Sequence, residues 1–462
     1  MTRWLLAPVD PRPIALLRIG LGALVLADIA DRLRQFHTFY TDYGMLARSD
    51  VPVALRWPSA LNPFFWSGEP AAIGAVFFFG ALAAACLLVG WRSRTAAVLT
   101  WAFLSALGAR NELVLNGADT VMRVLAFWLI FASPGAALSV DARRGAVAAP
   151  SRAALIALQA QVAIIYAAAG LHKHGDDWLN GTAIYRVLQI GVYARSWTRA
   201  LLDHPGLCAF FTYATLALEL GFVPLVLSPF RRPLCRAVAI GAACALHLGI
   251  FFAMRVGNLV WVMPVALCAF IEPAWLARLV PPASPGTRAQ RWTLAALVPL
   301  LLVFSDQWRQ LKEPESKRGV VLARVGLQQQ WPLFAPNPAR YDHRFTARAL
   351  TADGSTIDDV LSETLPELSA PPDAIYNRWL KARTSLSRRA HSPYLGGVGR
   401  LVCLRWKEAH GAPLAEMTIV LHVRSSVAPG EALAEEQHFD LWRQPCVFSA
   451  DGAGAASERA SP

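Results

Sequence analysis

The chain has 462 residues, of which 55% are hydrophobic and only 16% are charged. Soluble proteins carry roughly 25% charged residues, so this composition excludes an ordinary soluble protein and predicts an integral membrane protein. The formal charge of +12 does not indicate nucleic-acid binding, because the arginines lie in short clusters between apolar segments and not along one face. We therefore expect the lipid bilayer, and no nucleic acid, as the main partner.

Nine apolar segments approach the length of a membrane-spanning helix, which needs roughly 20 residues. The segments are residues 13–31, 70–90, 95–114, 119–137, 153–173, 208–228, 236–254, 257–276 and 292–306. The first is predicted to be an ordinary helix and not a cleaved signal peptide, because Arg18 and Asp28 interrupt it. The long links 32–69 and 174–207 are rich in aromatic residues and prolines, which predicts partly buried caps over the bundle.

Arginine clusters occupy every second link between the apolar segments. They are Arg92 and Arg94; Arg143, Arg144 and Arg152; Arg231, Arg232 and Arg236; and Arg278, Arg288 and Arg291. Cytoplasmic loops of membrane proteins are enriched in arginine and lysine, so we expect a cytoplasmic N-terminus and, after nine spans, an extracytoplasmic C-terminal domain. The preference for Arg and Ala over Lys indicates a bacterial, GC-rich source and hence the inner membrane.

From about Ser305 onward charges become frequent and short alternating segments appear. Residues 344–350, 401–406 and 417–423 are predicted to be strands, and residues 366–392 to be helical. The predicted fold is thus an all-α polytopic membrane bundle (1–306), a small α+β or β-rich domain (307–449) and a disordered tail (450–462) with few apolar groups. The domain's two cysteines, Cys403 and Cys446, would pair if that side of the membrane is oxidising; the sequence leaves this open.

Lys173 ends the fifth apolar segment and is the only lysine before Lys312. A partly desolvated lysine can lose its proton and act as a base, whereas arginine cannot. Ionisable groups at membrane depth usually face the bundle interior or a wet cavity, so Lys173 is a candidate catalytic residue. The competing interpretation is that its long side chain only reaches the membrane interface.

Three further ionisable positions lie within the apolar segments. Glu219 is deep in the sixth segment, where a carboxylate must be protonated or paired, with Lys173 as one candidate partner. His247 in the seventh segment is either a neutral core residue or a switch. Asp119 and Arg123 stand four residues apart at the start of the fourth segment, which predicts an ion pair on one helix face.

No metal site is predicted from the sequence. His172 and His174 are two residues apart and do not share a helix face, and the cysteines lack zinc-ligand spacing. The sequence also lacks a phosphate-binding Walker loop, a dinucleotide-binding glycine motif and the GxSxG motif of hydrolases.

The residues Ala169-Gly-Leu-His-Lys173 are followed by Asp177-Trp178 and then by Gly181. This order is similar to the lysine motif of the vitamin K-dependent γ-carboxylase family. Counterparts follow the same order over residues 10–340: Tyr40-x-Asp42-x-Gly44, Gly90-Trp-Arg92, Leu125-Ala-Phe127, Ser139-Val-Asp141, Glu219 and His247. The broader set is the horizontally transferred transmembrane (HTTM) domain family, whose bacterial members often carry a segment similar to Trp331-Pro-Leu-Phe-Ala-Pro336.

The resemblance implies a membrane enzyme that uses a reduced quinone of the vitamin K or menaquinol type. In the carboxylase the motif lysine deprotonates the hydroquinone, oxygen attacks, and the quinone alkoxide removes a proton from a glutamate γ-carbon, which traps carbon dioxide. Lys173 takes the lysine position, with Glu219 and His247 as tuning residues. Gly170, Asp177, Trp178, Gly181, Asp119 and Arg123 are expected to support the site, and the substrate would be a peptide or a small molecule.

One departure from the family pattern is visible at the start of the fourth apolar segment. The carboxylase has Asn-Asn-His there, whereas this chain reads Asn116-Gly-Ala-Asp119 and lacks the histidine. An alternative function is implied by bacterial relatives similar to the maturation protein of a sporulation-delaying toxin. In that case the chain would be a non-catalytic membrane protein for the maturation or export of a partner peptide.

Overall fold

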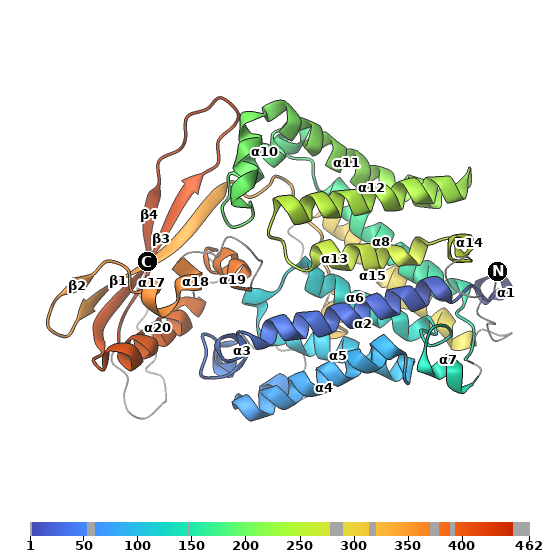
Figure 1. The fold of residues 1–462 in the computed structure, drawn as a ribbon, viewed down its shortest axis with the longest axis horizontal. Helices are drawn as coiled ribbons and strands as arrows, with labels where there is room; N and C mark the ends of the chain where they lie inside the picture. Colours follow the sequence, from blue (N-terminus) through green and yellow to red (C-terminus); the bar gives the residue numbers. More distant parts are fainter. Residues whose placement is uncertain are drawn as a thin grey trace.

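The computed structural model describes residues 2–52, 61–145, 147–277, 290–313, 320–369, 378–388 and 393–446. Long helices lie side by side in a bundle, and a small sheet with several short helices covers one end of it (Figure 1). The N-terminus lies at the opposite end of the bundle. The predicted disordered tail, 450–462, falls outside the described residues.

Among the described residues, five helices are long and apolar enough to cross a membrane: α2 (Arg12–Leu33), α4 (Pro70–Val89), α8 (Arg152–Leu171), α11 (Pro205–Leu227) and α12 (Arg232–Ala253). The other predicted spans form helices that are shorter or less apolar: α5 (Ser93–Arg110), α6 (Gly117–Phe131), α13 (Leu259–Leu267) with η7 (Cys268–Phe270), and η8 (Arg291–Ala296) with α15 (Leu297–Lys312). Every predicted apolar segment is thus helical, and a count of nine spans stays a prediction.

The ends of the bundle helices follow from local residue preferences. Proline occupies the first turn of α2, α4, α11 and α12, where its missing N–H costs no helical hydrogen bond. Gly90 ends α4 with a φ of +72°, a conformation that glycine adopts without steric cost. Asn116 and Asp119 form a reciprocal capping box at the start of α6.

The two long links form the predicted caps at the end of the bundle that the sheet covers. Their short helices are α3 (Phe36–Tyr40), η1 (Arg48–Asp50), η4 (Pro63–Phe65), α9 (Asp176–Leu179), α10 (Ala183–Leu188) and η6 (Ser196–Asp203). The first cap is tied to the bundle by Arg110, which donates to the carbonyl of Leu46 at 2.9 Å. The remaining short helices of the bundle are α1 (Thr2–Leu5), η5 (Glu112–Val114), α7 (Val140–Arg144) and α14 (Pro273–Leu276).

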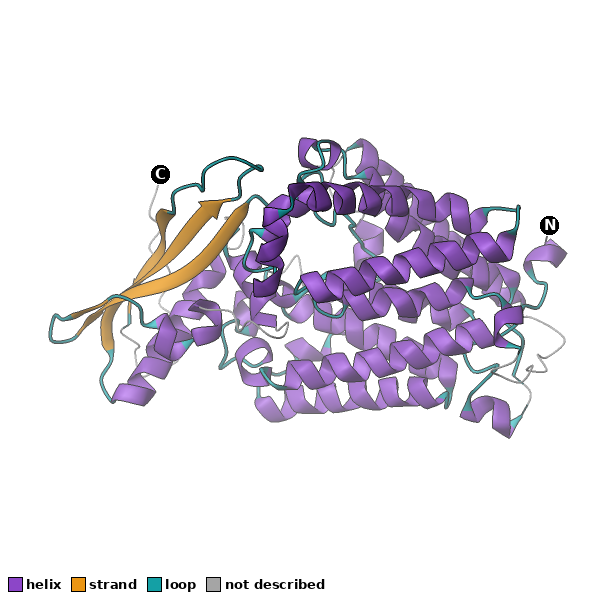
Figure 2. Cartoon of the chain, turned by 45° about the horizontal axis from the view of Figure 1, so that its top comes forward, coloured by secondary structure: helices purple, strands orange, loops and turns teal. Residues whose placement is uncertain are grey.

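Residues 320–446, which we call the C-terminal region, contain one antiparallel sheet in the order β2-β1-β3-β4 (Figure 2). The strands are β1 (Tyr341–Thr351), β2 (Thr356–Ile357), β3 (Leu414–Ser425) and β4 (Gln437–Pro445). The helices are α16 (Val320–Arg324), α17 (Leu361–Thr364), α18 (Pro366–Ser369), α19 (Arg378–Leu386) and α20 (Leu395–His410). Phe345 and Ala347 alternate with partly exposed residues of β1 and are fully buried, so one face of the sheet packs on the core.

Two of the three predicted strands lie within β1 and β3, and the third prediction, 401–406, was wrong. That segment is part of α20. The buried residues Leu395, Val398, Val402 and Trp406 recur every three or four positions, and this helical period outweighs the short alternation within 401–406. The predicted helical segment 366–392 contains α18 and α19, and its other residues include stretches outside the described part of the chain.

Cys403 and Cys446 form a disulfide bond with a Cα–Cα distance of 5.6 Å. The sequence had left this pairing open. The bond connects α20 to the residue that follows β4, so it fixes the C-terminal edge strand of the sheet to the helix beneath it. Closing a loop between residues that far apart in sequence restricts the unfolded chain and stabilises the folded one.

A buried network of charges joins the C-terminal region to the bundle. Arg378 of α19 reaches Asp119 of α6 at 2.9 Å and also pairs with Asp28 of α2. Arg32 pairs with the same two carboxylates, at 2.6 Å from Asp28. All four side chains are less than 10% exposed, so two positive and two negative charges compensate one another in the interior.

The predicted ion pair between Asp119 and Arg123 is not the one that forms. The Asp119 carboxylate is taken up by Arg32 and Arg378. Arg123 instead donates to the carbonyl of Gln328 at 2.8 Å. The local spacing of four residues favoured the helical pair, but two arginines from other elements approach the carboxylate more closely.

Replacing Arg378 with Gln should destabilise the protein by about 3–5 kcal/mol, because it leaves Asp28 and Asp119 with one buried counter-charge between them. The change should lower the midpoint of thermal unfolding in detergent and expose the C-terminal region to limited proteolysis. Arg348→Gln is the matched control, since Arg348 and its partner Asp440 are both more than half exposed and such pairs contribute about 1 kcal/mol or less. Equal effects of the two substitutions would contradict a docking role for Arg378.

Candidate functional site

Lys173 follows the end of α8 and turns back toward the bundle. Its Nζ donates to the carbonyl of Ala169, one turn earlier, at 3.1 Å. The residue is only 4% exposed, so its ammonium does not lie at the protein surface. The competing interpretation of Lys173 as a side chain that merely reaches the membrane interface therefore does not fit its position.

Glu219 of α11 is the partner of Lys173. Its two carboxylate oxygens lie 2.9 and 2.7 Å from Lys173 Nζ, and the residue is 7% exposed. Gly170 allows this approach, because a Cβ at that position would lie 3.1 Å from Glu219 Cβ and 3.0 Å from the Leu220 side chain. The indole ring of Trp178 lies 5.1 Å from Nζ, within the range of a cation–π contact.

The loop after Lys173 is held by the segment Trp331–Pro336 and the residue that follows it. Gly175 N–H donates to the carbonyl of Pro336 at 3.0 Å, and the indole N–H of Trp178 donates to the carbonyl of Phe334 at 2.7 Å. Asn337 accepts from the backbone N–H of Asp177 at 2.9 Å. The lysine motif and the segment Trp331–Pro336, two of the motifs that carried the family resemblance, thus contact each other although they are far apart in sequence.

Asp177 and Gly181 support the same loop from its other side. The Asp177 carboxylate pairs with Arg186 at 2.9 Å and with Arg340 at 3.0 Å. Gly181 has a φ of +75°, and a Cβ there would be 3.0 Å from the ring of Tyr213. Each of the four predicted support residues of the lysine motif therefore has an identifiable structural task.

His247 of α12 lies apart from the Lys173–Glu219 pair. Its Nε2 shares a hydrogen bond of 3.0 Å with the hydroxyl of Tyr166 on α8. The Tyr166 ring stacks on Phe222 of α11 with centroids 4.1 Å apart. His247 Nδ1 is buried and has no hydrogen-bond partner among the residues that the structure describes.

The two groups share α8 and α11. Tyr166 precedes Lys173 by about two helical turns, and Phe222 follows Glu219 by about one. The structure thus brings Lys173 and Glu219 into direct contact, and it joins His247 to this pair only through the helices that carry Tyr166 and Phe222. Asp119 and Arg123 belong to the charge network and to the contact with Gln328, described above.

Sequence reasoning missed a buried amide pair that positions Trp331. Gln161 of α8 donates to Gln329 at 2.6 Å, and the indole N–H groups of Trp128 and Trp331 donate to these two amides at 3.0 and 2.9 Å. Gln161 lies in the middle of an apolar segment, where an amide needs a partner. The position of Gln161 within that apolar segment could therefore have predicted a buried hydrogen-bond partner for its amide.

A double-mutant cycle should reveal the coupling between Lys173 and Glu219. Lys173→Met and Glu219→Leu should each lower stability by about 3–5 kcal/mol, because each leaves one charge buried without its partner. The double variant should be more stable than either single variant, since apolar replacement of a whole buried pair is often neutral. Thermal unfolding in detergent would provide the comparison.

Glu219→Gln tests the same contact with the shape of the side chain retained. It should destabilise as Glu219→Leu does, whereas Glu363→Gln, at an exposed carboxylate beside His410, should have little effect. Normal stability of Glu219→Gln would exclude the ion pair as a structural element.

Comparison with known proteins identifies the family. The model of the HTTM domain matches residues 6–275, which include α2 to α13 and the Lys173–Glu219 pair. No curated protein and no solved structure matches the chain. Since the matched segment covers more than half of the sequence, the chain belongs to the HTTM domain family.

Proposed function

We propose that this chain is a quinol-dependent, carboxylase-like membrane enzyme in which Lys173 is the general base and Glu219 its proton partner. The observation that carries the proposal is the buried ion pair between these residues, 2.7 Å apart at the closest atoms. Packing does not account for the pair, because apolar side chains in place of a buried ion pair are often equally stable. The family's lysine motif coincides with it.

The pair can provide a base without changing the net charge of the site. Lys173 must first lose its proton, and the Glu219 oxygens are within hydrogen-bond distance to accept it. The resulting free amine takes a proton from a hydroxyl group of the substrate. The ammonium that forms lies beside the new anion and stabilises it, which is worth most where water is excluded.

The cofactor that we propose is a reduced quinone, held on the helices that carry the pair and on α12. Tyr166 and Phe222 stack on each other with centroids 4.1 Å apart, so a planar ring would meet only their outer faces, and the unpartnered Nδ1 of His247 suits a hydroxyl or carbonyl oxygen. These three residues would hold the ring. When bound, the quinol would supply an acidic hydroxyl group and, with oxygen, the strong base known from the carboxylase. The proton acceptor on this chain would be Lys173 Nζ.

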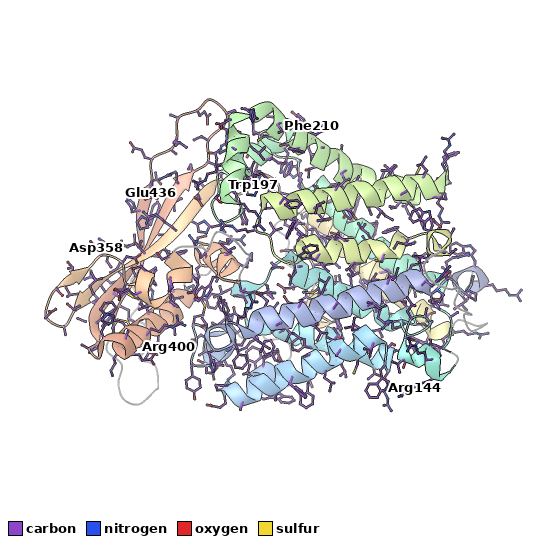
Figure 3. All side chains as sticks on the ribbon, viewed as in Figure 1. Arg144, Trp197, Phe210, Asp358, Arg400 and Glu436 are labelled. Carbon is purple, nitrogen blue, oxygen red and sulfur yellow. A yellow bond between two sulfur atoms is a disulfide. The ribbon has the colours of Figure 1, made fainter. Side chains whose placement is uncertain are left out.

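Several features support an arrangement with nine spans, a cytoplasmic N-terminus and an extracytoplasmic domain at 307–449, in a bacterial inner membrane. Arg144 and Asp358 lie at opposite ends of the molecule (Figure 3), and Arg144 belongs to one of the arginine clusters. The disulfide between Cys403 and Cys446 is of the kind that persists in oxidising compartments.

The alternative function, maturation or export of a partner peptide without catalysis, has one supporting feature. β4 is an edge strand of the sheet, and its first four residues are exposed. An exposed edge can accept an extended peptide as an additional strand. In that case Lys173 would be a structural residue. Function would then not require a side chain at position 173 that can lose and regain a proton.

Lys173→Ala and Lys173→Arg should both abolish quinol-dependent activity, because neither side chain can cycle a proton near neutral pH. The measurement is oxygen uptake by membranes that contain the protein and are supplied with reduced menaquinone or reduced vitamin K. Lys312→Arg, a lysine substitution at an exposed site, is the matched control and should retain activity.

Full activity of the Lys173→Arg variant would refute the general-base role. Mass spectrometry of lipids that co-purify with the protein gives a separate test. A bound quinone should be found with the unaltered chain and should be depleted in His247→Ala. Failure to detect uptake or a quinone with the unaltered chain would favour the maturation alternative.

Accessibility of single cysteines should reveal the orientation in the membrane. In a background without the five free cysteines, Asp358→Cys should react with an impermeant maleimide from outside intact cells. Arg144→Cys, at the opposite end, should react only after the membrane is permeabilised. Labelling in the reverse pattern would place the C-terminal region in the cytoplasm.

A further inference from the structure

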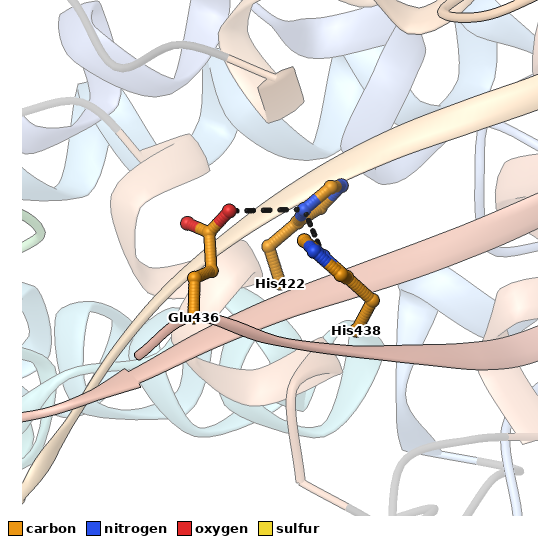
Figure 4. Close-up of side chains that lie close together, drawn as sticks. All are labelled: His422, Glu436 and His438. Atoms are coloured by element: carbon orange, nitrogen blue, oxygen red, sulfur yellow. Dashed lines mark hydrogen bonds and ion pairs between the residues drawn. The ribbon is translucent and has the colours of Figure 1, made fainter. Parts of the chain in front are cut away.

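We propose that His422, His438 and Glu436 form a zinc-binding site on the exposed face of the sheet. Their ligand atoms lie within 4.8 Å of one another, and no other group of three or more His, Cys, Asp or Glu side chains in the described part of the chain comes as close. Figure 4 shows the three side chains close together; His422 comes from β3, His438 from β4 and Glu436 from the residue just before β4. The site is independent of the chemistry proposed for Lys173.

Strand register brings the two histidines together. His422 of β3 and His438 of β4 are direct partners across the antiparallel ladder, so their side chains leave the same face of the sheet at close distance. Their Nδ1 atoms are 2.7 Å apart. Glu436 precedes His438 by two residues, which places it on the same face, and its Oε2 lies 3.5 Å from His422 Nδ1.

The donor set of two imidazoles and one carboxylate matches zinc. Zn²⁺ binds imidazole nitrogen at about 2.0–2.1 Å and carboxylate oxygen at about 2.0–2.2 Å, with three protein ligands and a fourth position for water or substrate in open sites. A tetrahedral ion would hold the two Nδ1 atoms about 3.3 Å apart. The distance between the two Nδ1 atoms must therefore increase by a few tenths of an ångström when zinc binds. A small rotation of the exposed His438 ring would provide this increase.

A second layer of contacts orients these ligands. His422 Nε2 shares a hydrogen bond of 2.7 Å with the hydroxyl of Thr346 on β1, which leaves Nδ1 directed at His438. Such outer partners of metal-bound histidines fix the ring and its tautomer. Arg344, the direct partner of His422 on β1, donates to Glu436 at 2.9 Å. It therefore competes with a cation for the same carboxylate.

The site lies at the base of the loop between β3 and β4, residues 426–436. The start of this loop contacts α10: Arg186 donates to the carbonyl of Ser426 at 2.7 Å, and Gln189 exchanges two hydrogen bonds with Val427. A bound zinc ion would clip the edge strand β4 to β3 at the end remote from the disulfide. It would thereby fix the loop that touches the cap over Lys173.

Zinc binding should be measured on the full chain in detergent, purified with an affinity tag that contains no histidine and stripped with EDTA. Equilibrium dialysis against zinc chloride, with elemental analysis, should give one ion per chain. Titration with Co²⁺ should produce the visible absorption of a tetrahedral complex. His422→Ala and His438→Ala should each weaken binding about tenfold or more, the loss typical even of outer-shell changes.

Two substitutions distinguish this site from general binding to surface histidines. His410→Ala removes a histidine that also lies 3.4 Å from a glutamate, Glu363, in the same region, and it should leave zinc binding unchanged. Arg344→Gln should tighten binding, because it releases Glu436 from the guanidinium. His438 is exposed on an edge strand, so its substitution should leave the thermal unfolding of the EDTA-treated protein unaltered.

Three results would overturn the proposal: no zinc binding by the unaltered chain at about 100 μM, unchanged binding by His438→Ala, or an equal loss in His410→Ala. Any of these results would show that His422, Glu436 and His438 only form hydrogen bonds and ion pairs with one another and do not bind zinc as a site. The binding measurement needs no enzymatic activity, so it stands or falls separately from the role of Lys173.

Discussion

Arg378 is the residue on which the relative placement of the two parts of the molecule depends. It projects from α19 of the C-terminal region and meets Asp28 and Asp119, which come from two different helices of the bundle. An isolated charge in such an interior would cost several kcal/mol. Because Arg32 supplies the second positive charge, the four groups are neutral only as a set. The C-terminal region cannot leave the bundle without exposing or stranding these charges.

The Lys173–Glu219 pair lies at the same end of the bundle. In this pair, as in the Arg378 network, each buried charge contacts an opposite charge. Lys173 has its three donor directions occupied by Ala169 and the two oxygens of Glu219. The loop that follows it is held by the segment Trp331–Pro336, which belongs to the C-terminal region. The segment Trp331–Pro336 thus contacts the lysine loop directly, and Arg378 holds the same C-terminal region on the bundle.

The contact between Lys173 and Glu219 could be anticipated from the sequence because few alternatives exist. Lys173 ends a long apolar segment and Glu219 lies within another, and burial forces such groups to find a partner. Arg378 could not be assigned in the same way, since it is one of many arginines in a polar region and lies 350 positions from Asp28. Its partners follow from the docking of domains, which no local pattern encodes.

The sheet also shows which contacts the sequence alone could not predict. The alternating residues of β1 and β3 indicated strands because one face of each is buried. β4 has mostly exposed side chains, so it carried no such pattern and was not predicted. Without β4 the pairing of β3 with its neighbour is unknown. The sequence then shows only two histidines, His422 and His438, on either side of a long loop. The proposed zinc ligands therefore become recognisable only when the ladder between β3 and β4 is known.

The surroundings of Lys173 bear on the function proposed for the ion pair. Charges interact far more strongly where water is excluded than at a surface, so the same burial that makes the pair costly also makes proton transfer between its members sensitive to a nearby anion. The C-terminal region contacts the cap next to Lys173 through the segment Trp331–Pro336 on the lysine loop, through Arg340 on Asp177, and through the β3–β4 loop on α10. In the function proposed for Lys173, these contacts would help to keep water away from the lysine and so preserve its coupling to Glu219.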